Sequence, residues 1–224
     1  MPSNSRKRLD ENANDIDSLV NLYKVTADLY LNSKIELPEK WDVLFRSAIV
    51  LMVSHWEAYV EDICEEALDH IVTNISDHQK LPKELKKQVA KEIKNSLNEN
   101  EAWELADHGW KNYVRKRMEY FRQERNRSFN TPKSENTKIF VMKILGIEEI
   151  CECWAFDSKD SAIISKQLDA LIEIRGEIAH RGRIGKKLDA KFITEQNAFL
   201  RKLASKTGGR INKHVKKVTG TPLF

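Results

Sequence analysis

Apolar residues recur at helical spacing along most of this chain, and the alternating pattern of β-strands is nearly absent. Glycine and proline are scarce, at 8 and 5 of 224 residues. A long helix is expected from Trp41 to Ile75. Its segment SAIVLMVSHWEAYV is apolar nearly all the way round, which is typical of a helix at the centre of a bundle. The pattern therefore predicts an all-α protein.

The same periodicity predicts further helices on both sides of the central one, separated by turn residues. Residues 15–206 would form one helical domain. Residues 1–14 would be a flexible N-terminus and residues 207–224 a basic tail, mobile until it meets a partner. Before and just after the central helix, we expect a helix at Asp15–Asn32, a charged helix starting near Pro82, and helical segments that continue to Arg127. Further along the chain, we expect a helix at Ser134–Leu145 that Gly146 ends, and a helix from Asp157 or Ser158 to His180 that Gly182 closes. The last expected helix is Leu188–Lys206.

The formal net charge of +4 is unevenly distributed along the chain. Residues 201–224 contain seven lysines and arginines and no acidic residue, which leaves a net charge of −3 for residues 1–200. A second basic patch lies between Lys111 and Arg127. Such patches suit phosphate backbones or anionic surfaces, although most basic patches are simply solvated helix faces.

Several classes of protein are excluded by what the sequence lacks. No apolar run approaches the ~20 residues of a membrane span, and residues 1–15 contain no hydrophobic signal core. Cys64, Cys151 and Cys153 form no disulfide or zinc framework, so we expect reduced thiols in a cytoplasmic protein. No phosphate-binding loop, zinc-protease motif or nucleophile elbow is present, and the six histidines do not cluster. We therefore expect no metal and no cofactor.

One segment, QLDALIEIRGEIAHRGRI, places a charged residue where the helical pattern requires an apolar one. Arg175 stands on the apolar line of this helix, where a guanidinium is costly unless it meets an anion and further hydrogen-bond partners. His180 follows at the expected end of the helix. Five residues turn a helix by ~500°, so the two side chains start ~140° apart, and a loosened last turn would let them share a cleft. The apolar line itself consists of Ile164, Leu168, Leu171, Ile178 and Ala179.

Glu57 is the corresponding polar residue of the central helix and could pair with Arg175 or orient His180 if the two helices are adjacent. One interpretation is a structural ion pair, with a histidine that the helix dipole favours at a C-terminus. The other is a metal-independent RNA-cleaving pair. His180 would take the proton of the ribose 2′-hydroxyl or supply one to the leaving 5′-oxygen, and Arg175 would hold the scissile phosphate. Arg181 and Arg183 would extend the cationic surface toward RNA.

Three segments, in this order along the chain, resemble the HEPN superfamily of helical domains. RSAIVLMVSHWEAYVEDI resembles the second helix of its RiboL-PSP-HEPN group. FNTPKSENTKIFVMKILGIEEI, followed by Trp154, resembles the middle segment of that group, and IRGEIAHRG resembles the R-x(4–6)-H signature. The resemblance extends from about Trp41 to Arg183 and is weaker between Asp77 and Gln123.

The resemblance implies a HEPN-like bundle of four to five core helices with additional helices. It also implies a homodimer in which two Arg/His pairs share a cleft at a two-fold axis. Members with the pair intact are typically metal-independent endoribonucleases that leave 2′,3′-cyclic phosphate ends, and many are toxins or serve in phage defence. A regulator such as an antitoxin is a further expected partner. Arg175 and His180 match the signature, and Glu57 matches a polar position of the preceding core helix.

Two other functions remain open. Gly176 stands where the superfamily often has Asn or another polar residue, which removes a hydrogen-bonding group from the site. This departure, with the lack of a fused effector domain, favours a non-catalytic HEPN module that binds a partner protein or nucleic acid. A DNA-binding regulator would use the tail from Arg201 to Phe224, although the sequence contains no helix-turn-helix.

Overall fold

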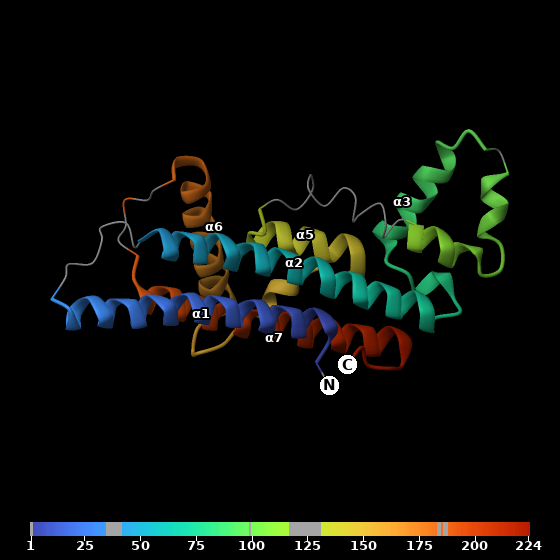
Figure 1. Ribbon diagram of the computed structural model, residues 1–224. Helices are drawn as coiled ribbons and strands as arrows, with labels where there is room; N and C mark the ends of the chain where they lie inside the picture. The colour runs from blue at the N-terminus through green and yellow to red at the C-terminus, as the bar shows by residue number, and fades with distance from the viewer. Residues whose placement is uncertain (1, 35–41, 99, 117–130, 183–184, 186–187) are drawn as a thin grey trace.

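The computed structural model describes residues 2–34, 42–98, 100–116, 131–182, 185 and 188–224. Within these residues the protein is all-α, as predicted, and an isolated bridge between Phe156 and Lys159 is the only β pairing. Figure 1 shows three long helices side by side, α1 (Asn4–Asn32), α2 (Asp42–Asn74) and α7 (Ala190–Thr219). The other elements are α3 (Lys83–Lys94), α5 (Ser134–Leu145), α6 (Ser161–Arg181) and the 3₁₀ segments η2 (His78–Lys80), η3 (Glu101–Leu105) and η4 (Ile150–Cys153).

Helix α2 is the centre of the bundle, because it contacts α1, α5, α6 and α7. The prediction of a long helix from Trp41 to Ile75 agrees with its bounds to within one residue at each end. By length and composition alone, α2 is the one helix among the described residues that could cross a membrane, which differs from the expectation that no apolar stretch is long enough; 44% of its most apolar stretch is buried inside the protein. Contact with four other helices requires apolar residues on several faces, which explains this composition.

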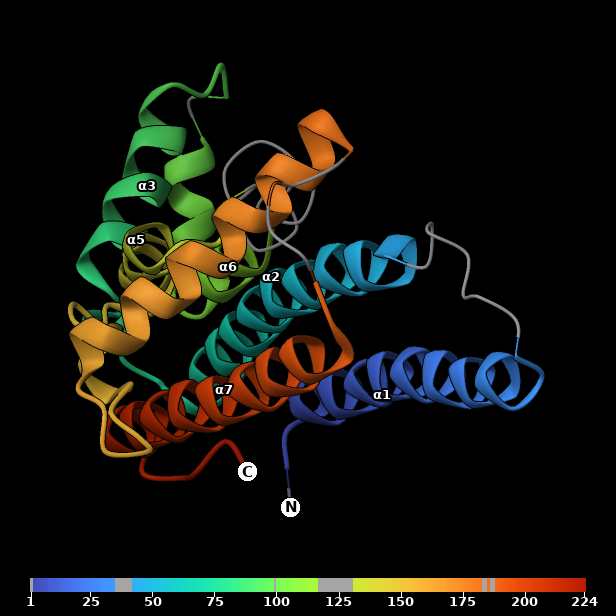
Figure 2. The same ribbon diagram turned by 90° about the vertical axis from the view of Figure 1, so that its left-hand side faces the viewer.

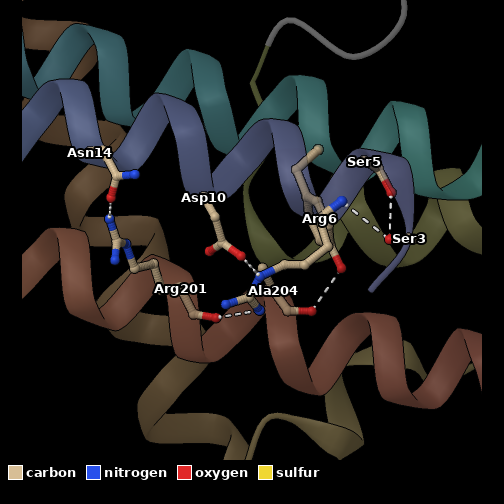
Figure 3. Close-up of polar contacts among 8 residues, drawn as sticks. Ser3, Ser5, Arg6, Asp10, Asn14, Arg201 and Ala204 are labelled. Atoms are coloured by element: carbon tan, nitrogen blue, oxygen red, sulfur yellow. Dashed lines mark hydrogen bonds and ion pairs between the residues drawn. The ribbon is translucent and has the colours of Figure 1, made fainter. Parts of the chain in front are cut away.

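The first helix begins at Asn4, so the prediction of a flexible N-terminus over residues 1–14 and a helix starting at Asp15 is wrong. The Ser3 side chain accepts a hydrogen bond from the Arg6 backbone N–H (3.1 Å), which caps the helix. Figure 3 shows how this end is tied down: Arg6 forms an ion pair with Asp10 (2.9 Å) and donates a hydrogen bond to the Arg201 carbonyl of α7 (3.1 Å). The buried apolar residues of α1 are Leu9, Ala13, Ile16 and Val20.

The last helix continues to Thr219, so the expected end at Lys206 and the expected mobile tail from residue 207 are also wrong. Two adjacent glycines, Gly208 and Gly209, suggested a break because glycine weakens a helix interior. The structure instead buries Gly208 against α2. A Cβ at position 208 would lie 2.7 Å from the Tyr59 hydroxyl oxygen, so the absence of a side chain lets α7 approach α2 closely.

Gly208→Ala is expected to lower the free energy of unfolding by about 1–3 kcal/mol, through overpacking. Tyr59 cannot move away freely, because it is buried and its hydroxyl donates a hydrogen bond to the Ala204 carbonyl (2.8 Å). Gly209→Ala is the matched control: nothing lies within 4 Å of its Cβ, so this change should stabilise α7 by about 0.5–1 kcal/mol. Urea unfolding of both variants measures the difference. Equal stabilities would contradict this account of the helix contact.

The remaining helices lie close to their predicted positions. Helix α5 has the expected bounds, and Gly146 ends it with a left-handed φ of 71°. Helix α6 begins at Ser161 instead of at Asp157 or Ser158, because those two residues adopt left-handed φ values of 52° and 60° in a tight turn before Asp160 caps the helix. Of the basic patch between Lys111 and Arg127, residues 117–127 lie outside the described residues.

Candidate active site

The candidate site is carried by α6, whose two ends are fixed by local hydrogen bonds. The Asp160 side chain accepts from the Ile163 backbone N–H (2.8 Å) at the start of the helix. Gly182, with φ 69°, ends it by donating to the Ile178 carbonyl (2.8 Å). The helix therefore stays regular through His180 and Arg181, and the loosened last turn that would bring His180 toward Arg175 does not form.

The position of α6 along the bundle is set by acidic residues that sequence reasoning did not single out. Asp169 accepts hydrogen bonds from both the backbone N–H (2.7 Å) and the hydroxyl (2.8 Å) of Ser134, at the first turn of α5. Glu173, four residues later, forms an ion pair with Lys133 (2.7 Å). The spacing of Asp169 and Glu173 places both on one face of the helix and was the available signal. These contacts fix the rotation of α6.

Arg175 meets Glu57 of α2, as the sequence suggested it could. The Nη2 atom of Arg175 lies 3.5 Å from Oε2 of Glu57, and the two side chains are only 25% and 21% exposed. Burial raises the pKa of Glu57, and the positive charge of Arg175 opposes that rise. A guanidinium has five N–H donors, and the ion pair with Glu57 is the one that the described residues give Arg175. This contact holds the guanidinium of α6 beside α2.

His180 lies in the exposed last turn of α6, which rises beyond α1, α2 and α7 in both views (Figures 1 and 2). Because the helix is regular, its side chain leaves the helix ~140° away from that of Arg175. The structure thus brings Arg175 to Glu57 but does not bring His180 to either within one chain. Arg181 is exposed beside it, and Arg183 lies outside the described residues. The predicted apolar line is buried at Ile164, Leu168, Leu171 and Ile178, whereas Ala179 is exposed.

The cysteines and histidines form no second site for metal or thiol chemistry among the residues that the structure describes. Among the residues that the structure describes, no three His, Cys, Asp or Glu side chains gather where they could hold a metal ion. Cys151 and Cys153 are half-buried, and burial is the main cause that raises their thiol pKa values to about 12 and about 11. Thiols with such pKa values stay protonated at neutral pH and are poor nucleophiles.

Gly176→Ala is expected to stabilise the protein by about 1 kcal/mol, because alanine loses less conformational freedom than glycine in a helix. A Cβ at position 176 meets no atom within 4 Å, so no steric penalty offsets the gain. Thermal melting of the variant beside the wild type measures the effect. A lower melting temperature would show that residue 176 needs the freedom of glycine.

The family model described as RiboL-PSP-HEPN matches residues 7–213. The match crosses both expected domain limits, at residues 14/15 and 206/207, and extends past the resemblance between Trp41 and Arg183. No curated protein and no solved structure matches the chain.

Proposed function

This chain belongs to the RiboL-PSP-HEPN family, and we propose that it is a metal-independent endoribonuclease. The observation that supports the proposal is the anchoring of Arg175 by Glu57 on the helix that ends in an exposed His180. An arginine held on a core helix is preorganised to bind a phosphate, and the imidazole of a histidine can accept or donate a proton. We propose a cytoplasmic location and a role in toxin action or phage defence.

In the proposed reaction the ribose 2′-oxygen attacks the adjacent phosphorus, and the bond from phosphorus to the 5′-oxygen breaks. One histidine accepts the proton of the 2′-hydroxyl, and a proton is returned to the leaving 5′-oxygen. Arg175 stabilises the extra negative charge on the phosphoryl oxygens through its planar fork. The products are a 2′,3′-cyclic phosphate and a free 5′-hydroxyl, so this step consumes no water.

We propose that two chains build the site. Within one chain, the side chains of His180 and Arg175 leave α6 in directions ~140° apart, so one scissile phosphate group cannot easily contact both of them. A two-fold axis beside the protruding end of α6 would bring a second His180 and Arg175 to the same cleft. The dimer would supply one histidine as base and one as acid, and Arg181 and Arg183 of both chains would line the approach of the RNA.

The second candidate is a non-catalytic module that binds a partner protein or nucleic acid. Under this function the ion pair between Arg175 and Glu57 has a structural role only. The observation that favours it is Gly176, which contributes no hydrogen-bonding side chain next to Arg175. Both functions are compatible with this fold, so activity must decide between the two.

The deciding experiment incubates total RNA with purified wild type and with His180→Ala, with EDTA present throughout. Cleavage by the wild type alone, leaving cyclic phosphate ends, is the expected result, and the loss is about 10²–10⁴-fold for a general acid or base. His180 is exposed, so the variant should fold and melt like the wild type. Equal cutting by both proteins would point to another site or a contaminant. No cutting by either, with both folded and dimeric, would support the binding module.

A further inference from the structure

Helix α7 carries a line of exposed cations that the candidate active site does not use. These five cations are spaced three or four residues apart, so their side chains all lie within an arc of ~80° around the helix axis. The line is ~22 Å long at 1.5 Å per residue. We call it the α7 basic face, and it consists of Lys202, Lys206, Arg210, Lys213 and Lys217, all exposed to solvent.

The α7 basic face has almost no counter-charge of its own. Lys202 forms an ion pair with Asp157 (2.6 Å). No ion pair is formed by the other four cations with any residue that the structure describes. No aspartate or glutamate occurs after Glu195 in the sequence. Like charges three or four residues apart on a helix repel each other, so the face is unfavourable until an anion covers it.

Three cations of the α7 basic face also lie close to Cys153 of η4. The Cys153 thiol donates a hydrogen bond to the Lys206 carbonyl (3.4 Å), which places η4 against this part of α7. Burial is the main cause that raises the pKa of this thiol, while the positive charges of Arg210, Lys206 and Lys213 oppose the rise. The positive charges of three of the five cations are thus all felt at the Cys153 thiol, where η4 packs against α7.

We propose that the α7 basic face binds the phosphate backbone of double-stranded nucleic acid. A ~22 Å line of cations is too long for a single phosphate or nucleotide, whereas a duplex carries a charge every few Å along its length. The face contains no aromatic residue on which an unpaired base could stack, which favours a duplex over a single strand. It contains no exposed apolar residue that could insert into lipid, which argues against a membrane surface.

This site is separate from the candidate active site. Lys202 is linked to Asp157, just before α6 begins, and α6 then extends ~30 Å over its 21 residues to the end that carries His180. In Figure 2 the C-terminal end of α6 lies far from the C-terminal half of α7. The α7 basic face could therefore hold a base-paired part of an RNA whose other part reaches His180, but the binding does not depend on cleavage.

Two triple variants with the same change in net charge test the proposal, both made in the His180→Ala protein so that RNA stays intact. The first replaces Lys206, Arg210 and Lys213 by glutamine. The control replaces Lys83, Lys91 and Lys94 of α3, which are exposed as well. Binding to a duplex RNA, a duplex DNA, a single-stranded RNA of equal length and a vesicle with anionic lipid is measured at several salt concentrations.

We expect the first variant to bind both duplexes about tenfold more weakly or worse, and the control to bind as the parent does. The slope of log K against log salt should change from about −4.5 for five phosphate contacts to about −2 for the two that remain. An equal loss in the control variant would overturn the proposal, because net charge alone would explain it. Single strands bound as tightly as duplexes, or binding to vesicles only, would overturn it too.

Discussion

Replacing Arg175 by alanine is expected to slow RNA cleavage by about 10²–10³-fold, the loss typical of removing one group that stabilises transition-state charge. The guanidinium is anchored by Glu57 at 3.5 Å on a core helix, so alanine removes a preorganised donor that water cannot replace in the same geometry. Arg175→Lys keeps the charge but loses the planar fork, and should give an intermediate rate. Initial rates on a defined RNA, with Lys166→Ala at the exposed start of α6 as control, measure the effect.

The same substitution should also lower the free energy of unfolding by about 1–3 kcal/mol, because it leaves the half-buried Glu57 without its partner. The double variant Arg175→Ala with Glu57→Gln should recover most of that stability but none of the cleavage. This contrast separates a catalytic arginine from a structural one. Unchanged cleavage by Arg175→Ala would remove Arg175 from the mechanism and leave the structural ion pair as its role.

The stability deficit of Arg175→Ala should depend on pH. Burial already raises the pKa of Glu57, and removing Arg175 takes away the charge that opposes the rise, so the pKa in the folded variant increases further. A raised carboxyl pKa means that the folded state binds the proton more tightly than the unfolded state. The deficit is therefore full above this pKa and shrinks as the pH falls through it. A deficit that grows at acid pH would contradict this assignment.

Trp154→Ala is expected to lower the free energy of unfolding by about 3–5 kcal/mol. The indole is fully buried, packs edge-to-face on Trp56 with ring centroids 6.1 Å apart, and donates a hydrogen bond to the Thr207 hydroxyl (2.9 Å). Truncation leaves a large cavity between η4, α2 and α7, and it also removes a hydrogen bond from a buried threonine. Urea unfolding measures the loss.

Two further variants make the Trp154 result interpretable. Trp103→Ala, where the side chain is 79% exposed, should change stability by less than about 0.5 kcal/mol. Thr207→Val should cost about 1–3 kcal/mol, because it leaves the buried indole N–H unpaired. If Trp154→Ala cost no more than Trp103→Ala, the proposed packing of η4 against α7 would be wrong.

Much of the fold followed from local features of the sequence. The all-round apolar character of the segment from Trp41 to Ile75 predicted a central helix, because only a helix contacted on several sides needs that composition. Gly146 and Gly182 predicted two helix ends, because glycine adopts the left-handed φ of a C-cap at little cost. Arg175, a charged residue on an apolar helix face, predicted an anionic partner because a buried charge needs one, and Glu57 was a candidate for it.

The two terminal segments were decided by tertiary contacts instead. The sequence around Ser3 and Arg6 is polar and looks flexible, but Arg6 reaches the Arg201 carbonyl of α7, 195 residues away. Gly208 looks like a helix break, but it lies inside α7 because Tyr59 of α2 fills the space of a side chain. Contacts between residues so distant in sequence cannot be read from periodicity, and they outweigh local helix propensity.

By itself, then, the sequence determined that this protein is helical, which helix is central, and that Arg175 requires an anion. Those conclusions rest on spacing and on the cost of burying a charge, which are local properties of the chain. Only the tertiary structure decided that α6 stays regular to Arg181, so that His180 faces solvent, away from Arg175. It also decided that the cations of residues 202–217 share one exposed face, because that depends on how α7 packs against α1 and α2.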